Sequence, residues 1–258
     1  MEFKTQFSLL ALVLLPSCFA PAIDGTARYT QLSPEGTLAI SDAALFTSNS
    51  LSELGLDDKE GVPGAAVDFQ WLGPHISVST QSGSWSGSGV LSGEFTDGTI
   101  SIPIGANVDS ELDLGIHSAI ITWDFLPGDA ELGLGFGVDF LDMQGSFTDQ
   151  ATAQVIDFDE TLPIPMLAVR GNVHVGPIEL GGYIAGFKFD YDGNDAEFID
   201  LDLMARYHFI GGATRASGSI VLGYRSITLD VDYKGDDDER IVADLDFTGP
   251  FIGAQLSF

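Results

Sequence analysis

The sequence predicts an all-β protein, an eight-stranded antiparallel up-and-down transmembrane β-barrel, from three observations. The stretch 197–209 alternates residue by residue between an apolar and a polar face, which is the period of a β-strand. Similar stretches recur along the chain, and no long helical pattern separates them. Mean hydropathy is +0.20 although the formal net charge is −28, so apolar and acidic side chains must be segregated in space. A barrel with a lipid-facing belt and solvated loops achieves this segregation.

The overall composition limits the class of protein. A length of 258 residues suits one large all-β domain. Lysine and arginine total 10 against 38 aspartate and glutamate residues, which argues against a nucleic-acid binder, because such a protein needs a basic surface. Cys18 is the single cysteine, so the chain forms no internal disulfide.

The N-terminal segment 1–22 has the pattern of a secretory signal peptide. Lys4 precedes an apolar run at 7–15, and Ala20-Pro21-Ala22 gives small residues around a cleavage point. The run is too short for a spanning helix. Cys18 leaves two alternatives open: removal with the signal, or lipidation as in bacterial lipoproteins, whose signal the residues before it resemble.

The next segment, 23–64, shows no sustained period and is interpreted as a periplasmic N-terminal lead. Ser50 and Glu53 have the spacing of a capping box, but Gly55 follows at once, so any helix is about one turn long. The barrel is then predicted to occupy 65–258.

Eight strands are predicted from alternating runs between turn residues. Their approximate ranges are 66–82, 111–126, 130–147, 161–175, 178–191, 196–210, 214–233 and 240–258. Tight connections marked by glycine and proline, at 127–129, 176–177 and 211–213, alternate with acidic and mostly longer ones, at 83–110, 148–160, 192–195 and 234–239. Short turns in the periplasm and longer loops outside are typical of outer-membrane barrels, so both termini are expected in the periplasm.

The last strand carries a resemblance to a known family. Ile252, Ala254, Leu256 and the terminal Phe258 share one face, which resembles the C-terminal signature of Gram-negative outer-membrane barrel proteins. By pattern, 66–258 resembles the small eight-stranded barrels such as the OmpA transmembrane domain, OmpX and OmpW. The resemblance implies a cell outer-membrane location and recognition of the Phe258 strand by the barrel-assembly machinery.

The polar faces of the predicted strands point into the lumen and hold a charge network. On the strand 178–191, Tyr183, Ala185, Phe187 and Phe189 are assigned to the lipid side, which puts Lys188 inside. A salt-bridge core is the simpler interpretation, and a gated ion path is the alternative. The network consists of Asp124, Glu131, Asp139, Arg170, Lys188, Asp200, Asp202, Arg206 and Arg225.

Toward the long loops the inward faces become apolar while their outward neighbours become acidic, so the barrel is predicted to extend beyond the lipid. The apolar positions form either a packed core under protruding hairpins or a cup for a small hydrophobic ligand. The candidate cup residues are Leu112, Leu114, Leu141, Met143, Ile164, Met166, Ile227, Leu229, Leu245 and Phe247.

Catalytic and metal motifs are weak. His75 and Ser77 share a strand face, a spacing similar to that of outer-membrane lipid A deacylases, but the pair lies in an early strand and no carboxylate is assigned to it. His75, His174 and His208 fall near the periplasmic ends of their strands and can face inward, which leaves a metal site as an alternative. Because they lack metal-motif spacing, they are interpreted as polar lumen side chains, and no metal and no cofactor are predicted. The acidic segments 190–195 and 236–239 are expected to bind divalent cations weakly at most.

The functional expectation is a non-enzymatic outer-membrane barrel, structural or surface-interacting, with the apolar cup as its candidate ligand site. A narrow channel for small solutes is the alternative, and a lipid-modifying enzyme comes third. The expected partners are outer-membrane lipid, lipopolysaccharide and the assembly machinery, with no nucleic acid, and the protein is expected to be a monomer.

Overall fold

A computed structural model describes residues 22–41, 48–71, 73–96, 99–126, 130–191, 194–210, 217–234 and 240–258. The predicted signal peptide up to residue 21, with Cys18, lies outside the described residues. So does the acidic run 236–239, and the segment 190–195 is described only in part.

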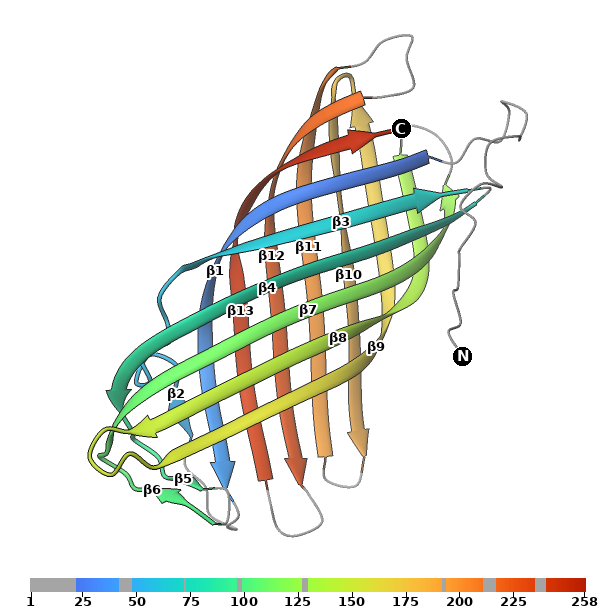
Figure 1. Cartoon of the computed structure of the whole chain (residues 1–258). Coiled ribbons are helices and arrows are strands. Elements are labelled where there is room, and N and C mark those ends of the chain that lie inside the picture. The colour runs from blue at the N-terminus through green and yellow to red at the C-terminus, as the bar shows by residue number, and fades with distance from the viewer. Residues whose placement is uncertain are drawn as a thin grey trace, which may run out of the picture.

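The described residues form a closed antiparallel barrel of ten strands, with three short extra strands outside the ring (Figure 1). The strands follow one another round the ring in chain order, and β13 pairs with β1 to close it. The all-β, antiparallel prediction is confirmed, and the number eight is wrong. The ring strands are β1 (Ala22–Ser41), β3 (Glu60–Gln70), β4 (Pro74–Val90), β7 (Asn107–Leu126), β8 (Ala130–Asp149), β9 (Val155–Val175), β10 (Ile178–Tyr191), β11 (Asn194–Ile210), β12 (Ser217–Lys234) and β13 (Arg240–Ser257).

The two additional strands arise from the predicted lead segment and from a missed turn. β1 begins at Ala22, the last residue of the predicted signal peptide, and otherwise lies within the predicted periplasmic lead 23–64; it pairs along its length with β13. The predicted strand 66–82 is broken by a turn at Gly73, whose φ of 126° favours glycine, so its halves belong to β3 and β4. Glycine, serine and proline interrupt the apolar alternation in both regions, which hid the period of two.

The two ends of the barrel differ in their connections. Short turns join β3 to β4, β7 to β8, β9 to β10 and β11 to β12, and this short-turn end also holds the C-terminus (Figure 1). The opposite long-loop end carries β2 (Asn49–Ser50), β5 (Phe95–Thr96) and β6 (Ser101–Ile102). Gly176-Pro177 forms a two-residue turn, where Gly176 has a φ of 63°.

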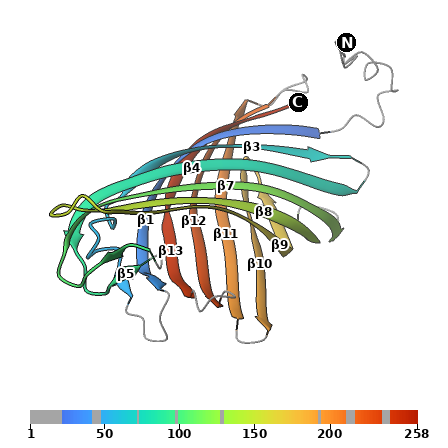
Figure 2. The same ribbon diagram turned by 60° about the horizontal axis from the view of Figure 1, so that its bottom comes forward.

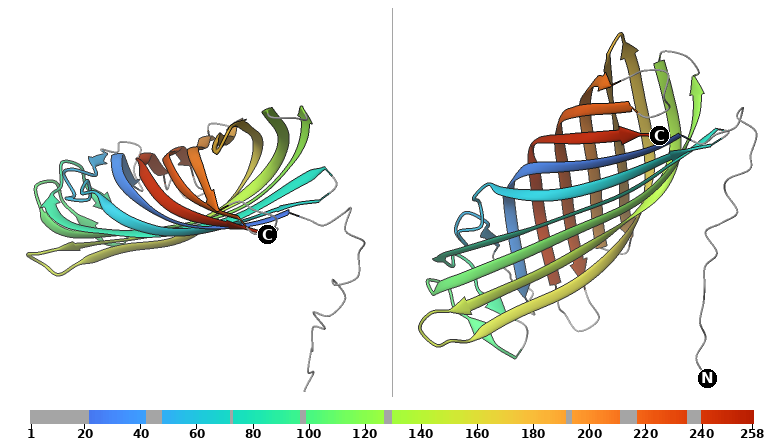
Figure 3. Two further views of the ribbon diagram at one scale, coloured as in Figure 1. Left: turned by 90° about the horizontal axis from the view of Figure 1, so that it is seen from above. Right: turned by 45° about the horizontal axis from the view of Figure 1, so that its top comes forward.

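The strands are much longer than a membrane requires. Several contain 17 to 21 residues, whereas a spanning strand needs about 9–11. They are tilted and strongly curved (Figure 2), and β1 and β13 lie side by side where the ring closes (Figure 3). No helix among the described residues is long and apolar enough to span a membrane.

A belt of exposed apolar side chains surrounds the half of the barrel nearest the short turns. Phe136 is 56% exposed, Leu203 50% and Leu222 54%, and the outward positions beyond them toward the long loops are polar, as at Asp230 and Asp244. Lipid is the environment in which such a belt is stable. The part of each strand beyond the belt, here called the extension, is therefore surrounded by water.

Two connections at the long-loop end fold into the extension. Ser50 and Glu53 form the expected capping box: the Ser50 N–H donates to Glu53 Oε2 at 3.0 Å, and the Glu53 N–H donates to Ser50 Oγ at 3.2 Å. The single turn that they start lies against Gly87 and Gly89 of β4, where any side chain would collide with its backbone. Leu51 and Leu54 in this turn, and Phe95 and Ile102 in the next connection, are buried in the core.

The face assignment of β10 is corrected by the structure. Tyr183 and Ala185 point inward, and Ile178, Leu180 and Ile184 are exposed on the lipid side. Both faces of this strand carry apolar residues, and Gly181, Gly182 and Gly186 interrupt them, so the pattern alone does not distinguish inside from outside. The Tyr183 hydroxyl decides the face, because it requires a polar partner when buried.

Candidate functional site in the barrel lumen

A layer of buried polar side chains crosses the lumen at mid-height. Arg225 of β12 donates from Nε to Asp200 Oδ1 at 3.1 Å and from Nη2 to Asp200 Oδ2 at 2.8 Å. Its Nη1 donates to Gln81 Oε1 of β4 at 2.8 Å. β4 and β11, which carry Gln81 and Asp200, are separated by four strands in either direction round the ring, so these contacts join opposite walls.

Further contacts complete this mid-barrel layer. Arg28 of β1 forms an ion pair with Asp202 and donates to Gln81 Oε1 at 3.3 Å, and its guanidinium lies 5.2 Å from the Phe251 ring centre. Tyr183 donates its hydroxyl to Asp200 Oδ2 at 2.8 Å. Buried charges are stable only when paired and hydrogen-bonded, and this layer supplies both conditions. It consists of Arg28, Gln81, Tyr183, Asp200, Asp202 and Arg225.

On the long-loop side of this layer the interior is a packed apolar core. Nine of the ten candidate cup residues are at most 8% exposed, and Ile164 packs against the same cluster. Trp85 and Phe247 lie 5.4 Å apart between ring centres, and Phe95 and Phe147 lie 4.7 Å apart. The inward loop residues Leu51 and Leu54 cover the cluster. This arrangement supports the packed-core alternative for the cup residues.

On the short-turn side the lumen contains a polar cavity of about 310 Å³. Ser79 and Thr122 line its walls, and Tyr183 and Asp202 contribute from the mid-barrel layer. Five carboxylates and three guanidinium groups line it, which leaves it acidic when its histidines are neutral.

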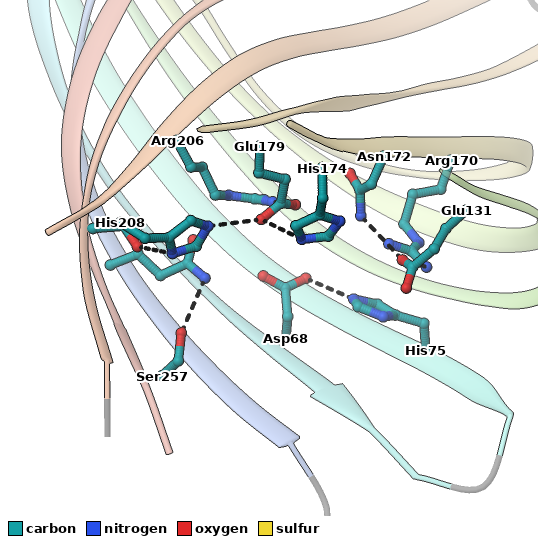
Figure 4. A network of polar contacts seen from close by, with 12 residues as sticks. Asp68, His75, Glu131, Arg170, Asn172, His174, Glu179, Arg206, His208 and Ser257 are labelled. Carbon is teal, nitrogen blue, oxygen red and sulfur yellow. Dashed lines mark hydrogen bonds and ion pairs between the residues drawn. The ribbon is translucent and has the colours of Figure 1, made fainter. Parts of the chain in front are cut away.

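A second polar network surrounds this cavity near the short-turn end (Figure 4). Arg170 Nη2 lies 2.7 Å from Asp124 Oδ1 and 3.4 Å from Glu131 Oε2. Asp68 Oδ1 lies 3.5 Å from His75 Nε2. Each of these pairs links neighbouring or next-neighbouring strands, so they stabilise the association of strands in the barrel wall.

Glu179 at the start of β10 is the centre of a separate cluster in the same view. Arg206 forms an ion pair with its Oε1. His174 Nε2 and His208 Nε2 lie 3.5 Å and 3.3 Å from its Oε2 (Figure 4). The carboxylate is buried, whereas His174 is 43% exposed.

The structure places most of the predicted lumen charges in these networks, and it places one of them on the outer surface instead. Asp124, Glu131 and Arg170 contact one another in the network near the short-turn end. Asp139 is fully buried, and its directly opposed strand neighbour is Ser118. Lys188 is a correction: it is 65% exposed and pairs with Glu197 at 2.5 Å on the outer surface. The wrong face assignment of β10 caused this error. The remaining members, Asp200, Asp202, Arg206 and Arg225, lie in the clusters above.

The His75 and Ser77 pair lies on the lumen wall and lines the cavity. His75 contacts Asp68, the directly opposed strand neighbour of Ser77. The carboxylate therefore lies between the two groups, and nothing in this contact places the imidazole next to the serine hydroxyl as a general base would require.

Several residues of the networks escaped the sequence-based prediction. Arg28 lies in β1, which was not recognised as a strand, although Asp24, Thr26 and Arg28 alternate there with small and apolar residues. Glu179 was missed because of the reversed face of β10. Gln81 is a neutral residue whose role depends on a partner from the opposite wall, which no local pattern shows.

Comparison with known proteins identifies the fold. No family model matches the chain, and no curated protein matches its sequence. Among solved structures, the outer-membrane protease OmpT of Escherichia coli is similar over 93% of this chain and 97% of its own, with a TM-score of 0.51 and 14% sequence identity. The chain has an outer-membrane β-barrel fold.

Two further matches are more distant. Ail, the attachment invasion locus protein of Yersinia pestis, covers 92% of this chain and 99% of its own at 9% identity, with a TM-score of 0.35. The toluene transporter TodX of Pseudomonas putida covers 94% of this chain and 90% of its own at 9% identity, with a TM-score of 0.29.

The fold and the lipid-facing belt together support the outer-membrane location. The likeness to OmpT shows the fold alone, and a fold does not by itself define an activity.

Proposed function

We propose that this barrel is a non-enzymatic, non-conducting outer-membrane protein that presents a packed acidic extension at the cell surface. The observation that carries the proposal is the mid-barrel layer: Arg225 and Asp200 are fully buried, and their contacts with Gln81 reach across the lumen. The apolar core adds a second obstruction on the long-loop side. An open path for solutes would require both to move.

The outer surface of the extension supports a role toward the exterior. Asp230 lies directly opposite Asp244 on one side and Glu197 on the other, so a row of like charges crosses three strands. Such a row keeps the extension soluble and discourages association through its outer face. Stability of the extension comes from its core, which leaves the outer face free to vary.

Conductance measurements test the closed lumen. Purified barrel inserted into planar bilayers should show no conductance steps. A variant that lacks 48–58 and carries Arg225→Ala loses the loop residues that cover the core and the central cation of the mid-barrel layer, and any conductance that it shows verifies that insertion is detected. Regular steps from the unaltered protein would contradict the proposal and favour the narrow channel.

The orientation in the membrane has its own test. An epitope inserted at Thr152, between β8 and β9 at the long-loop end, should bind antibody on intact cells. The same epitope at Gly176, at the short-turn end, should bind only after the outer membrane is permeabilised. The reverse result would show that the extension points into the periplasm.

A further inference from the structure

The strand register brings two histidines and a glutamate together at the rim of the polar cavity. The tight turn at Gly176-Pro177 sets His174 of β9 directly opposite Glu179 of β10. On the other side, Glu179 is opposite Arg206 of β11, and His208 lies two residues further along the same face of β11. Residues 34 positions apart in the chain thus meet through pairing of three neighbouring strands, without any local motif.

The distances in this cluster match those of a tetrahedral metal site. Ligand atoms about 2.0–2.2 Å from Zn²⁺ in tetrahedral geometry are about 3.3–3.5 Å from one another. The two imidazole Nε2 atoms lie 3.5 Å and 3.3 Å from Glu179 Oε2. Each of the three residues also offers one ligand atom within 4.8 Å of the others. Two of the three distances between ligand atoms therefore already suit a bound Zn²⁺, and the exposed His174 is the ligand that can move to adjust the third.

The surroundings of the cluster orient its ligand atoms toward this point. His208 Nδ1 lies 2.7 Å from Ser219 Oγ, so an Nδ1–H donor leaves the Nε2 lone pair free. Among the described residues, the buried Nε2 of His208 makes no hydrogen bond, and it lies 3.3 Å from Glu179 Oε2. Arg206 binds Oε1 of Glu179, which fixes the carboxylate and leaves Oε2 for a ligand.

We propose that His174, Glu179 and His208 form a binding site for Zn²⁺. Two imidazoles and a carboxylate suit Zn²⁺ and other late first-row divalent ions, whereas Mg²⁺ and Ca²⁺ prefer oxygen ligands alone. The adjoining cavity carries more carboxylates than guanidinium groups, which attracts a cation despite Arg206. Three protein ligands leave a fourth position for water.

The proposal is tested by metal titration of the folded, chelator-treated barrel in detergent. A single Zn²⁺ should bind per chain, and Co²⁺ at the same site should give the visible absorption of a tetrahedral complex. His174→Ala, His208→Ala and Glu179→Gln should each weaken binding by more than about tenfold. Affinity should fall at acid pH, because protons compete for the imidazoles.

Two further variants distinguish an organised site from general attraction of cations. Ser219→Ala removes only the group that orients His208 and should weaken Zn²⁺ binding by about tenfold to a hundredfold. His117→Ala is the matched control, since His117 lies on the outer face beside Asp142, and it should leave binding unchanged. Electrophoretic heat-modifiability of each variant verifies that the barrel is folded.

Two results would overturn the proposal. In one, the double variant His174→Ala/His208→Ala binds Zn²⁺ as well as the unaltered protein, which would assign the ion to carboxylates elsewhere. In the other, no Zn²⁺ binds to the folded barrel, and the cluster is an ion-pair network around Glu179. Neither result depends on whether the lumen conducts.

Discussion

The two halves of the barrel interior differ in chemistry although the same strands alternate through both: the interior of the extension is apolar, and the interior near the short turns is polar. In β12, Ile227 and Leu229 point into the apolar core of the extension, whereas Ser219 points into the polar half near the short turns. In β11, Phe198 lies above the mid-barrel layer and Arg206 below it. These two strands thus change the chemistry of their inward faces where they leave the lipid belt.

The environment outside the wall explains the difference. Within the belt, apolar side chains face lipid, so the wall is stable without an apolar interior and the lumen can hold charges and a cavity. In the extension, water surrounds the wall, and apolar side chains are removed from water only by turning inward. The extension is therefore organised like a soluble β-protein, and the mid-barrel layer marks the boundary inside.

The largest expected loss of stability follows from a substitution in the mid-barrel layer, which separates the two halves of the interior. Arg225→Ala leaves Asp200 buried without its cation, which typically costs about 3–5 kcal/mol. Urea unfolding of the barrel in detergent measures this cost. Lys188→Ala removes an exposed ion pair with Glu197 and should cost less than about 1 kcal/mol. If both variants lost the same free energy of unfolding, the buried layer would contribute no more to stability than an exposed ion pair.

The second effect concerns the loop that fills the extension. Leu54 is fully buried although it lies in a connection, so Leu54→Ala should destabilise the folded barrel by about 2–5 kcal/mol. Ile104 lies in the neighbouring connection and is 61% exposed, and Ile104→Ala should have little effect. Protease sensitivity of the long-loop end should rise in the first variant alone. An unchanged Leu54→Ala variant would mean that the loop does not seal the core.

The regions that the sequence predicted well are those where one face is uniformly apolar. β11 alternates without interruption, and its faces were assigned correctly. In β4, Gly83, Gly87 and Gly89 occupy the inward face because loops and Trp85 need the space, so that face has no hydrophobic signal. The second half of β4 was missed for this reason, and β1 was missed because glycine, serine and proline interrupt its apolar alternation.

The polar clusters were predictable only in part. Their inward position follows from the period of two, but their pairing depends on the order and number of strands in the ring. Gln81 meets Arg225 only because ten strands place their walls opposite each other, and His208 meets Glu179 only through the register of β10 and β11. Neither contact can be predicted from the spacing of residues within one strand.

A smaller effect tests the contact between β4 and the inserted turn. A side chain at Gly87 would collide with the carbonyl oxygen of Gly55, so Gly87→Ala forces the turn to shift and should cost about 1–3 kcal/mol. The matched control is Gly25→Ala in β1, where a Cβ meets nothing within 4 Å. Urea unfolding compares the two. If the control is the more destabilised, the turn is not seated on β4.

The smallest effect lies on the outer face of the extension and depends on pH. Partial burial, together with the carboxylates of Asp244 and Asp195, raises the pKa of Asp230 above its usual value. A raised pKa in the folded state means that ionisation opposes folding: stability is complete below the ordinary aspartate pKa and falls as pH rises through the folded value. Asp230→Asn removes this penalty.

The variant should therefore be slightly more stable than the unaltered protein at neutral pH, by less than about 1 kcal/mol because water screens the exposed row. The gain should vanish in acid, where Asp230 is protonated in both states. Urea unfolding at several pH values measures it, and high salt should reduce it. A gain that persists in acid would assign the effect to packing of the amide and would separate the stability of the extension from the charge on its surface.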